Sequence, residues 1–482
     1  MTRQASPAAY PPAPVTDFVT PDGLRAAAVA VAGALERAAA RHPGPYSGAD
    51  PAALKRAIDA LDPLPEQGAG FEAALAQIEE LVLANGVDVA DPLCAAHLHA
   101  PPLLAAAAAE LAIGATNQSM DSFDQAPAAT YVEDRLVRRL AELLGLPSRA
   151  SGVMTAGGTA SNLLGLLLAR DHAARRIGVD LAAGGLPDAA RSWRIAASAN
   201  AHFSVRRAAG LLGLGGDAVI PVATDERGRM DPAALDRVTG EVIAIVGTAG
   251  TTDLGAVDPL AALADRAAAR GAWLHVDAAL GAGLMVSERL RPRFDGIERA
   301  DSVTADLHKL LWQPIGASVL LVRDAALLDV VHHHSDYLNR AEDEAEGVLN
   351  LVGRSLDTSR RFDALKVLLS LRAVGRTRLA AMAEHLVDMA QLAARRIEAH
   401  PDLELVAEPS TVTVVFRASG GDERNTAVQR RLFASGRAVI GRTRIDGAVA
   451  LKLTLVNPLV TPAAIDALLS AVADESAISQ NS

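Results

Sequence analysis

The sequence predicts an α/β protein built on a mostly parallel central sheet. From about residue 150 to residue 325, short runs rich in β-branched and apolar residues alternate with longer stretches whose apolar residues recur every three or four positions. This alternation is typical of strand–helix–strand units with helices on both faces of the sheet. Half of the 482 residues are apolar, which is enough for a large core.

The expected strands and helices alternate through this region. We expect strands at 193–198, 242–246, 273–276, 302–304 and 317–322, and helices at 161–174, 205–212, 259–270 and 325–331. In such a sheet, ligands bind where the carboxyl ends of the strands open into loops. Residues that follow these strands are therefore the first candidates for a functional site.

The remainder of the chain divides into flanking regions. Residues 1–22, rich in Pro and Ala, are expected to form a flexible arm, and residues 23–100 a helical N-terminal segment. Residues 101–376 then form the large α/β domain and residues 377–482 a small α+β domain. Further helices are expected at 101–114, 128–144, 361–374, 378–399 and 461–475, and strands of the small domain at 403–408, 411–418 and 449–456.

Charge and cysteine content argue against several classes of protein. The chain has 46 Lys and Arg against 57 Asp and Glu, and this net charge of −11 disfavours binding to nucleic acid or to an anionic membrane. The single cysteine, Cys94, excludes an internal disulfide and a Cys-rich metal site. We find no signal peptide and no apolar run of the ~18 residues that a membrane span needs. The expectation is a cytoplasmic enzyme without a bound metal.

Lysine is scarce, and only Lys55, Lys309, Lys366 and Lys452 are present. Because arginine stays protonated and cannot do amine chemistry, each lysine is a candidate for such chemistry. Most of the four are nevertheless expected to be ordinary surface residues, with Lys55 on the polar side of a helix and Lys452 pointing to solvent from a half-buried strand.

Five segments with chemically useful residues each begin or end at a predicted strand. They are TAGGTASN (155–162), NAHFSVRRAAG (200–210), GTAGTTDLGAVDP (247–259), WLHVDAA (273–279) and SVTADLHKLLWQP (302–314). The first is a Gly-rich turn before a helix, which suits a phosphate group but matches neither a Walker A loop nor GxGxxG. Asp277 ends an apolar strand, where a carboxylate needs a cation or hydrogen-bond donors unless it caps a helix.

One cofactor requires all of these features together. Pyridoxal phosphate needs a lysine for its Schiff base, a carboxylate for its pyridine nitrogen, a phosphate cup and a ring to stack on. Lys309 and Asp277 supply the first two, and the imidazole of His202 is a candidate for the ring. A lone histidine is more often a structural hydrogen-bonding residue, so the assignment of His202 depends on the other residues.

Taken together, the segments resemble the group II pyridoxal-phosphate-dependent amino acid decarboxylases, the family of aromatic amino acid and glutamate decarboxylases. The resemblance extends from about residue 82 to residue 462, and it is carried by HVDAA, by HK 32 positions later, by GTAGTT and by ADSVT. It implies the aspartate aminotransferase-like fold of fold type I, pyridoxal 5'-phosphate as cofactor, and conversion of an L-amino acid to the amine and carbon dioxide.

The resemblance also implies roles for individual residues. Lys309 would hold the cofactor, Asp277 its pyridine nitrogen, and His202 would stack on the ring opposite Ala279. The other implied cofactor-binding residues are Gly158, Thr159, Thr252 and His308, together with Thr358 and Ser359, which would close the phosphate site of the partner in a homodimer. Two departures from the family, Leu280 in place of Tyr and Leu310 in place of Trp, concern the shape of the pocket.

A mobile loop carrying a tyrosine is also implied. Tyr337 lies 28 residues after Lys309 in a charged segment. We interpret Tyr337 as the acid that protonates Cα after carbon dioxide leaves, delivered by closure of the loop at 334–346. The alternative is a surface tyrosine.

The substrate is less closely defined by the sequence. Segments 95–102, 115–130 and 335–366 look most like bacterial decarboxylases of diamino acids such as 2,4-diaminobutyrate, lysine and ornithine. Asp121 and Asp124 would suit a distal ammonium, although helix capping is an alternative, whereas His97 and His99 favour an acidic or aromatic substrate. An aminotransferase using Arg442 or Arg444 and a catalytically silent binding protein stay open as alternatives. The three consecutive histidines at 332–334 cannot all face one metal ion.

Overall fold

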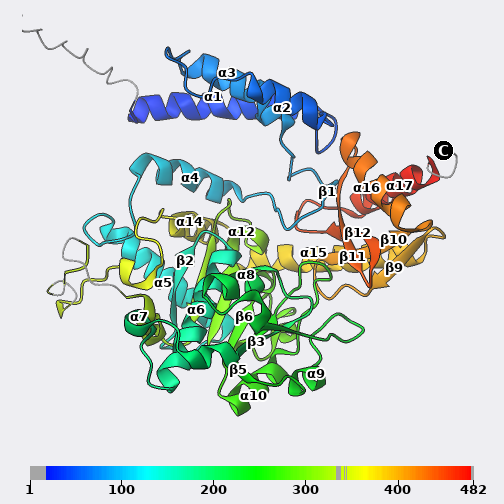
Figure 1. Ribbon diagram of the computed structural model, residues 1–482. Helices are drawn as coiled ribbons and strands as arrows, with labels where there is room; N and C mark the ends of the chain where they lie inside the picture. Colours follow the sequence, from blue (N-terminus) through cyan, green and yellow to red (C-terminus); the bar gives the residue numbers. More distant parts are fainter. Residues whose placement is uncertain (1–17, 333–337, 341, 343–344, 479–482) are drawn as a thin grey trace, which may run out of the picture. The chain divides into compact units, whose positions relative to one another are not determined.

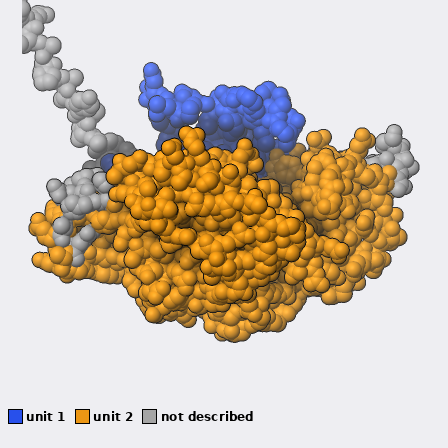
Figure 2. Space-filling view, turned by 60° about the horizontal axis from the view of Figure 1, so that its bottom comes forward, with its two compact units in different colours: residues 1–43, 49–86 blue, residues 44–48, 87–482 orange. Residues whose placement is uncertain are grey.

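The computed structural model describes residues 18–332, 338–340, 342 and 345–478 (Figure 1). It divides into two compact units, coloured separately in Figure 2: residues 1–43 with 49–86, and residues 44–48 with 87–482. Unit 1 contains α1 (Pro21–Ala39), α2 (Pro51–Asp59), α3 (Phe71–Leu81) and the 3₁₀ turn η2 (Leu83–Asn85).

The helices of unit 1 bury little apolar surface. The side chains of Thr20 and Asp50 cap α1 and α2, and a proline follows each cap in the first turn. The only fully buried apolar side chains among its described residues are Ala34, Ala38 and Ala84. The apolar core that unit 1 forms from its own described residues is therefore small.

Unit 2 is centred on a seven-stranded sheet whose order is β2–β8–β7–β6–β5–β3–β4. Within this sheet, β8 alone runs opposite to the others, because it pairs antiparallel with both β7 and β2. The strands are β2 (Ser151–Thr155), β3 (Trp193–Ser198), β4 (Val219–Val222), β5 (Glu241–Thr248), β6 (Trp273–Asp277), β7 (Ser302–Asp306) and β8 (Ser318–Val322).

Helices cover both faces of this sheet. On one face, α6 (Gly158–Arg176) and α8 (Ser204–Leu211) pack with Val246; on the other, α5 (Pro127–Leu144) and α10 (Leu260–Arg270) pack with Ile245. Adjacent residues of β5 therefore enter different cores. This two-sided burial explains why almost every residue of β5, polar or apolar, is buried.

The large sheet has further short helices and 3₁₀ turns in the segments that connect or follow its strands. Two longer helices, α4 and α14, pack on each other. These elements are α4 (Leu104–Thr116), α7 (Leu181–Gly184), α9 (Pro232–Asp236), α11 (Gly281–Leu284), α12 (Leu307–Leu310), α14 (Ala364–Val374), η3 (Asp188–Ser192), η4 (Gly216–Ala218), η5 (Arg291–Phe294), η6 (Ile297–Arg299), η7 (Ala325–Val331) and η8 (Val352–Arg354).

A second sheet of five strands, with the order β1–β11–β12–β10–β9, follows in the C-terminal part. Its first strand comes from much earlier in the chain, since β1 (Cys94–Ala95) pairs in parallel with β11. The other elements here are α15 (Arg376–Glu398), β9 (Leu403–Ala407), β10 (Thr413–Ala418), α16 (Gly421–Ala434), β11 (Val439–Ile445), β12 (Ala448–Thr454) and α17 (Pro462–Ile478). The indole N–H of Trp312, from the segment after α12, donates to the carbonyl of Val456, from the segment after β12, at 2.9 Å.

The predicted fold class is confirmed, with the mostly parallel sheet and the small C-terminal sheet in the expected places. Strands β1, β2, β4 and β11 were not predicted, and the helix expected at 325–331 is the 3₁₀ helix η7. The domain boundaries at residues 22, 100 and 376 stay predictions. No helix among the described residues combines the length and the apolar character that crossing a bilayer requires.

The expectation of mostly exposed lysines is wrong for Lys366. Its side chain on α14 is fully buried, and its ammonium lies 2.9 Å from a carboxylate oxygen of Glu110 and 2.9 Å from one of Asp363. Arg361 also pairs with both carboxylates. The result is a structural cluster in which the buried cation has two anionic partners.

Removal of this cation should therefore destabilise the protein. For Lys366→Met we expect a loss at the lower end of the ~3–5 kcal/mol that breaking a buried ion pair costs, because Arg361 keeps both carboxylates paired. The midpoint of chemical denaturation measures the loss. Lys55→Met is the matched control, since Lys55 pairs with Asp59 at the surface and its loss should cost at most about 0.5 kcal/mol. Equal shifts in the two variants would contradict the structural role of Lys366.

Candidate active site

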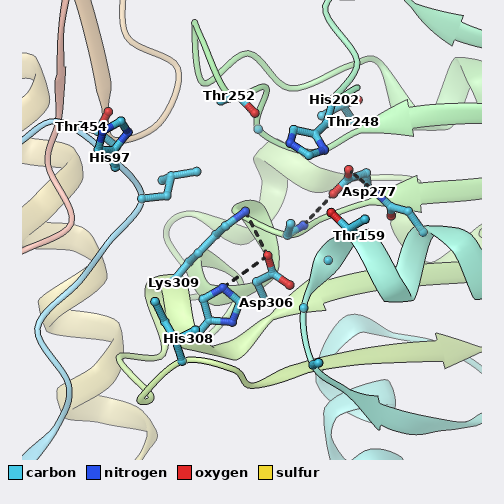
Figure 3. A pocket seen from close by; sticks show the side chains of 18 of the residues that line it. His97, Thr159, His202, Thr248, Thr252, Asp277, Asp306, His308, Lys309 and Thr454 are labelled. Atoms are coloured by element: carbon cyan, nitrogen blue, oxygen red, sulfur yellow. Dashed lines mark hydrogen bonds and ion pairs between the residues drawn. The ribbon is translucent and has the colours of Figure 1, made fainter. Parts of the chain in front are cut away.

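The carboxyl ends of five strands meet at one edge of the large sheet, and a cavity of about 360 Å³ opens there (Figure 3). These five strands, β2, β3, β5, β6 and β7, all run in the same direction, so their carboxyl ends share that edge. The predicted residues that line the cavity are His97, Gly158, Thr159, His202, Thr252, Asp277, Ala279, His308 and Lys309.

Further residues line the same cavity but were not predicted as part of the site. They are Leu98, Ala156, Gly157, Asn162, Thr248, Gly250, Asp306, Ile315, Lys452 and Thr454. Six of these residues lie inside segments that the sequence analysis singled out: Ala156, Gly157 and Asn162 in TAGGTASN, Thr248 and Gly250 in GTAGTTDLGAVDP, and Asp306 in SVTADLHKLLWQP. The burial of Asn162 and Asp306 was not expected.

Lys309 stands one helical turn after the end of β7 and is held by Asp306. Its ammonium lies 3.0 Å from Oδ2 of Asp306, whose side chain is buried. Figure 3 shows both side chains directed into the cavity. The neighbouring imidazole of His308 bonds to the carbonyl oxygen of Ala317 at 2.8 Å, and a carbonyl can only accept, so Nδ1 of His308 is the donor.

Asp277 presents a buried carboxylate with two donors. Oδ2 accepts from the side-chain amide of Asn162 at 2.8 Å, and Oδ1 accepts from the backbone N–H of Ala279 at 3.1 Å. These donors compensate for the loss of water around the charge. The remaining lone pairs of Asp277 are free to receive a proton-bearing group of a ligand.

His202 and Ala279 give the cavity a flat ring and a small side chain. Nδ1 of His202 lies 2.8 Å from the hydroxyl of Ser204. Burial lowers the pKa of His202, an effect that the charge of Asp277 partly opposes and that of Lys309 reinforces. The imidazole is therefore neutral near pH 7.

The start of α6 has the features of an anion site. Gly157 is its N-cap and supplies no side-chain cap, so the first turn of this 19-residue helix directs its backbone N–H groups toward the cavity. A Cβ on Gly158 would lie 2.9 Å from Oδ2 of Asp306, which makes glycine necessary for the close approach of the helix to β7. Thr159 adds a hydroxyl beside this turn.

Two buried polar atoms that line the cavity have no hydrogen-bond partner among the described residues. They are Oγ1 of Thr248 and Oδ1 of Asp306. Since buried polar atoms are nearly always satisfied, both indicate a polar ligand. An amine, a buried carboxylate, a flat ring, a helix N-terminus and two unsatisfied polar atoms together fit pyridoxal 5'-phosphate.

Lys452 corrects an expectation, because it does not point to solvent. Its side chain is buried, its ammonium lies 3.1 Å from the carbonyl of Thr252 and 3.5 Å from a carboxylate oxygen of Asp253, and it lines the cavity. Strand β12 is covered on both faces, so its alternating pattern did not mark a solvent-facing side. Burial and the charge of Lys452 together lower the pKa of His97.

Several predicted residues do not line the cavity of their own chain. Asp121 accepts a hydrogen bond from the backbone N–H of Ser122, and Asp124 accepts one from the hydroxyl of Ser122. Neither aspartate caps the helix that follows, because the N-cap of α5 is Ala126 and no side chain caps it. The others are His99, Thr358 and Ser359, with Arg442 and Arg444 of the aminotransferase alternative. Tyr337 and part of its loop lie outside the described residues. Among those that are described, no group of three His, Cys, Asp or Glu side chains could hold a metal ion.

Several known proteins are similar to this chain in sequence and in fold. Residues 51–419 match the family described as "Pyridoxal-dependent decarboxylase conserved domain". The chain is 45% identical over 442 residues to an L-2,4-diaminobutyrate decarboxylase from Rhizobium meliloti (strain 1021), which covers 89% of this chain and 87% of the relative. It is 38% identical over 452 residues to an L-2,4-diaminobutyrate decarboxylase from Acinetobacter baumannii, with coverages of 89% and 88%.

A solved structure agrees closely with the fold. It is the glutamate decarboxylase domain of the diaminobutyrate-pyruvate transaminase and L-2,4-diaminobutyrate decarboxylase from Vibrio parahaemolyticus. The two structures superpose with a TM-score of 0.87 at 37% identity and cover 96% of this chain and 98% of the other.

Lys309 is expected to be the lysine that bonds to the cofactor. Borohydride reduction of protein loaded with pyridoxal 5'-phosphate, followed by peptide mapping, should place the label on Lys309. Lys452 is the competing amine in the same cavity, but the carbonyl of Thr252 and the carboxylate of Asp253 hold it. Lys309→Ala should lose the label and Lys452→Ala should keep it. A label on Lys452 in the wild-type protein would overturn the assignment.

Proposed function

Because the chain belongs to the pyridoxal-dependent decarboxylase family, we propose that it converts L-2,4-diaminobutyrate to propane-1,3-diamine and carbon dioxide. Decarboxylation of an amino acid with pyridoxal phosphate is the activity of the family. The choice of substrate rests on one observation, the 45% identity over nearly the whole length of an enzyme with this specificity.

The roles of Lys309 and Asp277 follow from their chemistry and position. Bound pyridoxal phosphate supplies an electron-accepting ring, joined to the substrate's amino nitrogen, for the electrons of the breaking bond to the carboxylate. Lys309 would hold the cofactor, and Asp306, 3.0 Å away, would pair with the ammonium of Lys309 whenever that amine is free. Asp277 keeps a proton on the ring nitrogen, because its buried carboxylate favours a cationic partner.

The remaining residues orient the reacting groups. The imidazole of His202 and the methyl group of Ala279 would bound the two faces of the ring, which excludes water from it. The first turn of α6 at Gly158 and Thr159 would bind the phosphate, and Asp277 would hold the ring nitrogen. Such positioning lets the bond to the carboxylate lie perpendicular to the ring, as its cleavage requires.

Decarboxylation of an acidic amino acid is the second candidate activity. The observation in its favour is the pair of basic side chains, Lys452 and His97, that line the cavity together. A carboxylate or sulfinate on the substrate's side chain would be attracted to the ammonium of Lys452. The second ammonium of 2,4-diaminobutyrate would instead need a carboxylate as its partner.

A panel of L-amino acids separates the two activities. We expect 2,4-diaminobutyrate to give the highest kcat/KM for release of carbon dioxide, about tenfold or more above aspartate and cysteine sulfinate, because a site built for one charged group rejects the opposite charge. Mass spectrometry should identify propane-1,3-diamine as the product. A preference for the acidic substrates would favour the second candidate and reject the first.

We propose further that the protein acts as a homodimer in the cytoplasm. Among its described residues, unit 1 exposes large apolar side chains, including Val29, Leu35, Leu64 and Phe71, while its buried apolar side chains are three alanines. A second copy could cover this surface, since twofold dimers are the commonest closed assembly. The exposed Ser359 is then available to a neighbouring subunit.

Light scattering tests the dimer. We expect the mass of two chains at assay concentrations, and replacement of Leu64 and Phe71 by Ser should shift the protein toward monomers while leaving the far-ultraviolet circular dichroism of unit 2 in place. Leu459→Ser is the matched control, because Leu459 is exposed on unit 2 to a similar extent. A fully active wild-type monomer would contradict the proposal.

A further inference from the structure

A continuous chain of buried hydrogen bonds runs behind the cavity. The indole Nε1 of Trp273 donates to Oγ of Ser302 at 2.8 Å, and the same Oγ lies 2.8 Å from Nδ1 of His275. Nε2 of His275 lies 3.0 Å from Oδ1 of Asn162. All four side chains are buried, and Gly165 makes room for the imidazole, because a Cβ there would lie 2.6 Å from its ring.

The chain continues from Asn162 to two groups at the cavity. Nδ2 of Asn162 donates to Oδ2 of Asp277 at 2.8 Å and to Oγ of Ser204 at 2.9 Å. Oγ of Ser204 then lies 2.8 Å from Nδ1 of His202, which also accepts the backbone N–H of Ser204 at 3.3 Å.

The donor and acceptor roles in the bonds among Trp273, Ser302 and His275 follow from groups that can only donate or only accept. An indole N–H can only donate, so Ser302 accepts from Trp273 and has its own hydrogen free for Nδ1 of His275. Burial lowers the pKa of His275 to about 4, so the ring carries one proton near pH 7. That proton is on Nε2, because Nδ1 accepts from Ser302 and Oδ1 of Asn162 needs a donor.

The contact with Asp277 independently determines the orientation of the Asn162 amide. An ionised carboxylate can only accept, so the nitrogen of the Asn162 amide faces Asp277 and the oxygen faces His275. The second amide hydrogen goes to Ser204, whose hydroxyl hydrogen is then directed to Nδ1 of His202. A ring nitrogen that accepts two hydrogen bonds carries no proton, so the proton of neutral His202 is on Nε2.

We propose that Asn162 is a positioning residue that orients the carboxylate of Asp277 and also sets the tautomer of His202. Its amide N–H donates to the carboxylate of Asp277, and through Ser204 it fixes His202 in the Nε2–H tautomer. His202 therefore offers the cavity a hydrogen-bond donor and cannot take up a proton at Nε2 as a base. This inference rests on the proposed function only in that the bound cofactor would contact both of these groups.

An amide is the side chain that this position requires. It places an acceptor toward His275 and two donors toward Asp277 and Ser204. The isosteric change Asn162→Asp removes both donors. Ser204 would then donate to residue 162, and Nδ1 of His202 would have to donate to Ser204, which reverses the tautomer.

Neutron diffraction from perdeuterated crystals of the loaded enzyme tests the proposal without turnover. In the wild-type protein we expect deuterium on Nε2 and none on Nδ1 of both His202 and His275. In Asn162→Asp the deuterium of His202 should move to Nδ1. Deuterium on Nδ1 of His202 in the wild type, or an unchanged His202 in Asn162→Asp, would overturn the proposal. A different substrate preference would leave these positions as they are.

A second readout is the affinity of the apoenzyme for pyridoxal 5'-phosphate. Asn162→Asp should weaken it about tenfold or more, because two adjacent carboxylates share a proton and Asp277 loses charge. Ser204→Ala separates the two effects of Asn162. In the Ser204→Ala background, Asn162→Asp should still weaken the affinity but should leave His202 as it is in Ser204→Ala alone. A change at His202 in this background would show that Ser204 is not the link.

Discussion

The parallel pairing of β5, β6 and β7 is the constraint on which the cavity depends. In this register Thr248 lies opposite Asp277, and Asp277 lies opposite Thr304, two residues before Asp306. A slip of one residue would turn every side chain to the other face and would separate Asp277 from Lys309. The buried apolar residues on both faces of these strands hold the register, so the core of the sheet and the geometry of the site have the same cause.

The cavity concentrates charge where water is scarce. Asp277, Asp306 and Lys452 are buried and the side chain of Lys309 is 20% exposed, and each has a partner of opposite charge or a hydrogen-bonding group. Such groups are costly to bury singly and are stable here because they satisfy one another. The unsatisfied oxygens of Thr248 and Asp306 mark where that balance is incomplete without a ligand.

Much of this arrangement could be predicted from the sequence, because its signals are local. The strands β3, β5, β6 and β7 are short runs rich in apolar and β-branched residues; Asp277 ends β6, and Lys309 comes three residues after the end of β7. The family resemblance was confirmed by the match over residues 51–419. It could supply roles for individual residues, which stay predictions, but it could not show how the residues contact one another.

What could not be predicted depends on contacts between distant segments. Strand β2 is short and contains Gly152, and it is a strand only because β8 pairs with it. Lys452 alternates with apolar residues, yet both faces of its strand are covered. Asn162 and His275 carry no sign in the sequence that their side chains meet 113 positions apart. The prediction for Tyr337 stays a prediction, since it lies outside the described residues.

The pairing of β1 with β11 has a consequence for synthesis on the ribosome. Cys94 and Ala95 pair with Val439 and Ile440, so the strand that precedes His97 has no partner until some 345 more residues have been made. At ~5–20 residues per second this delay is on the order of tens of seconds. During that time the nascent chain can complete the large sheet, but the wall of the cavity formed by His97, Leu98 and Lys452 is still absent. Only a chain translated almost to its end can therefore enclose a substrate, and a prematurely released fragment leaves the cavity open on that side.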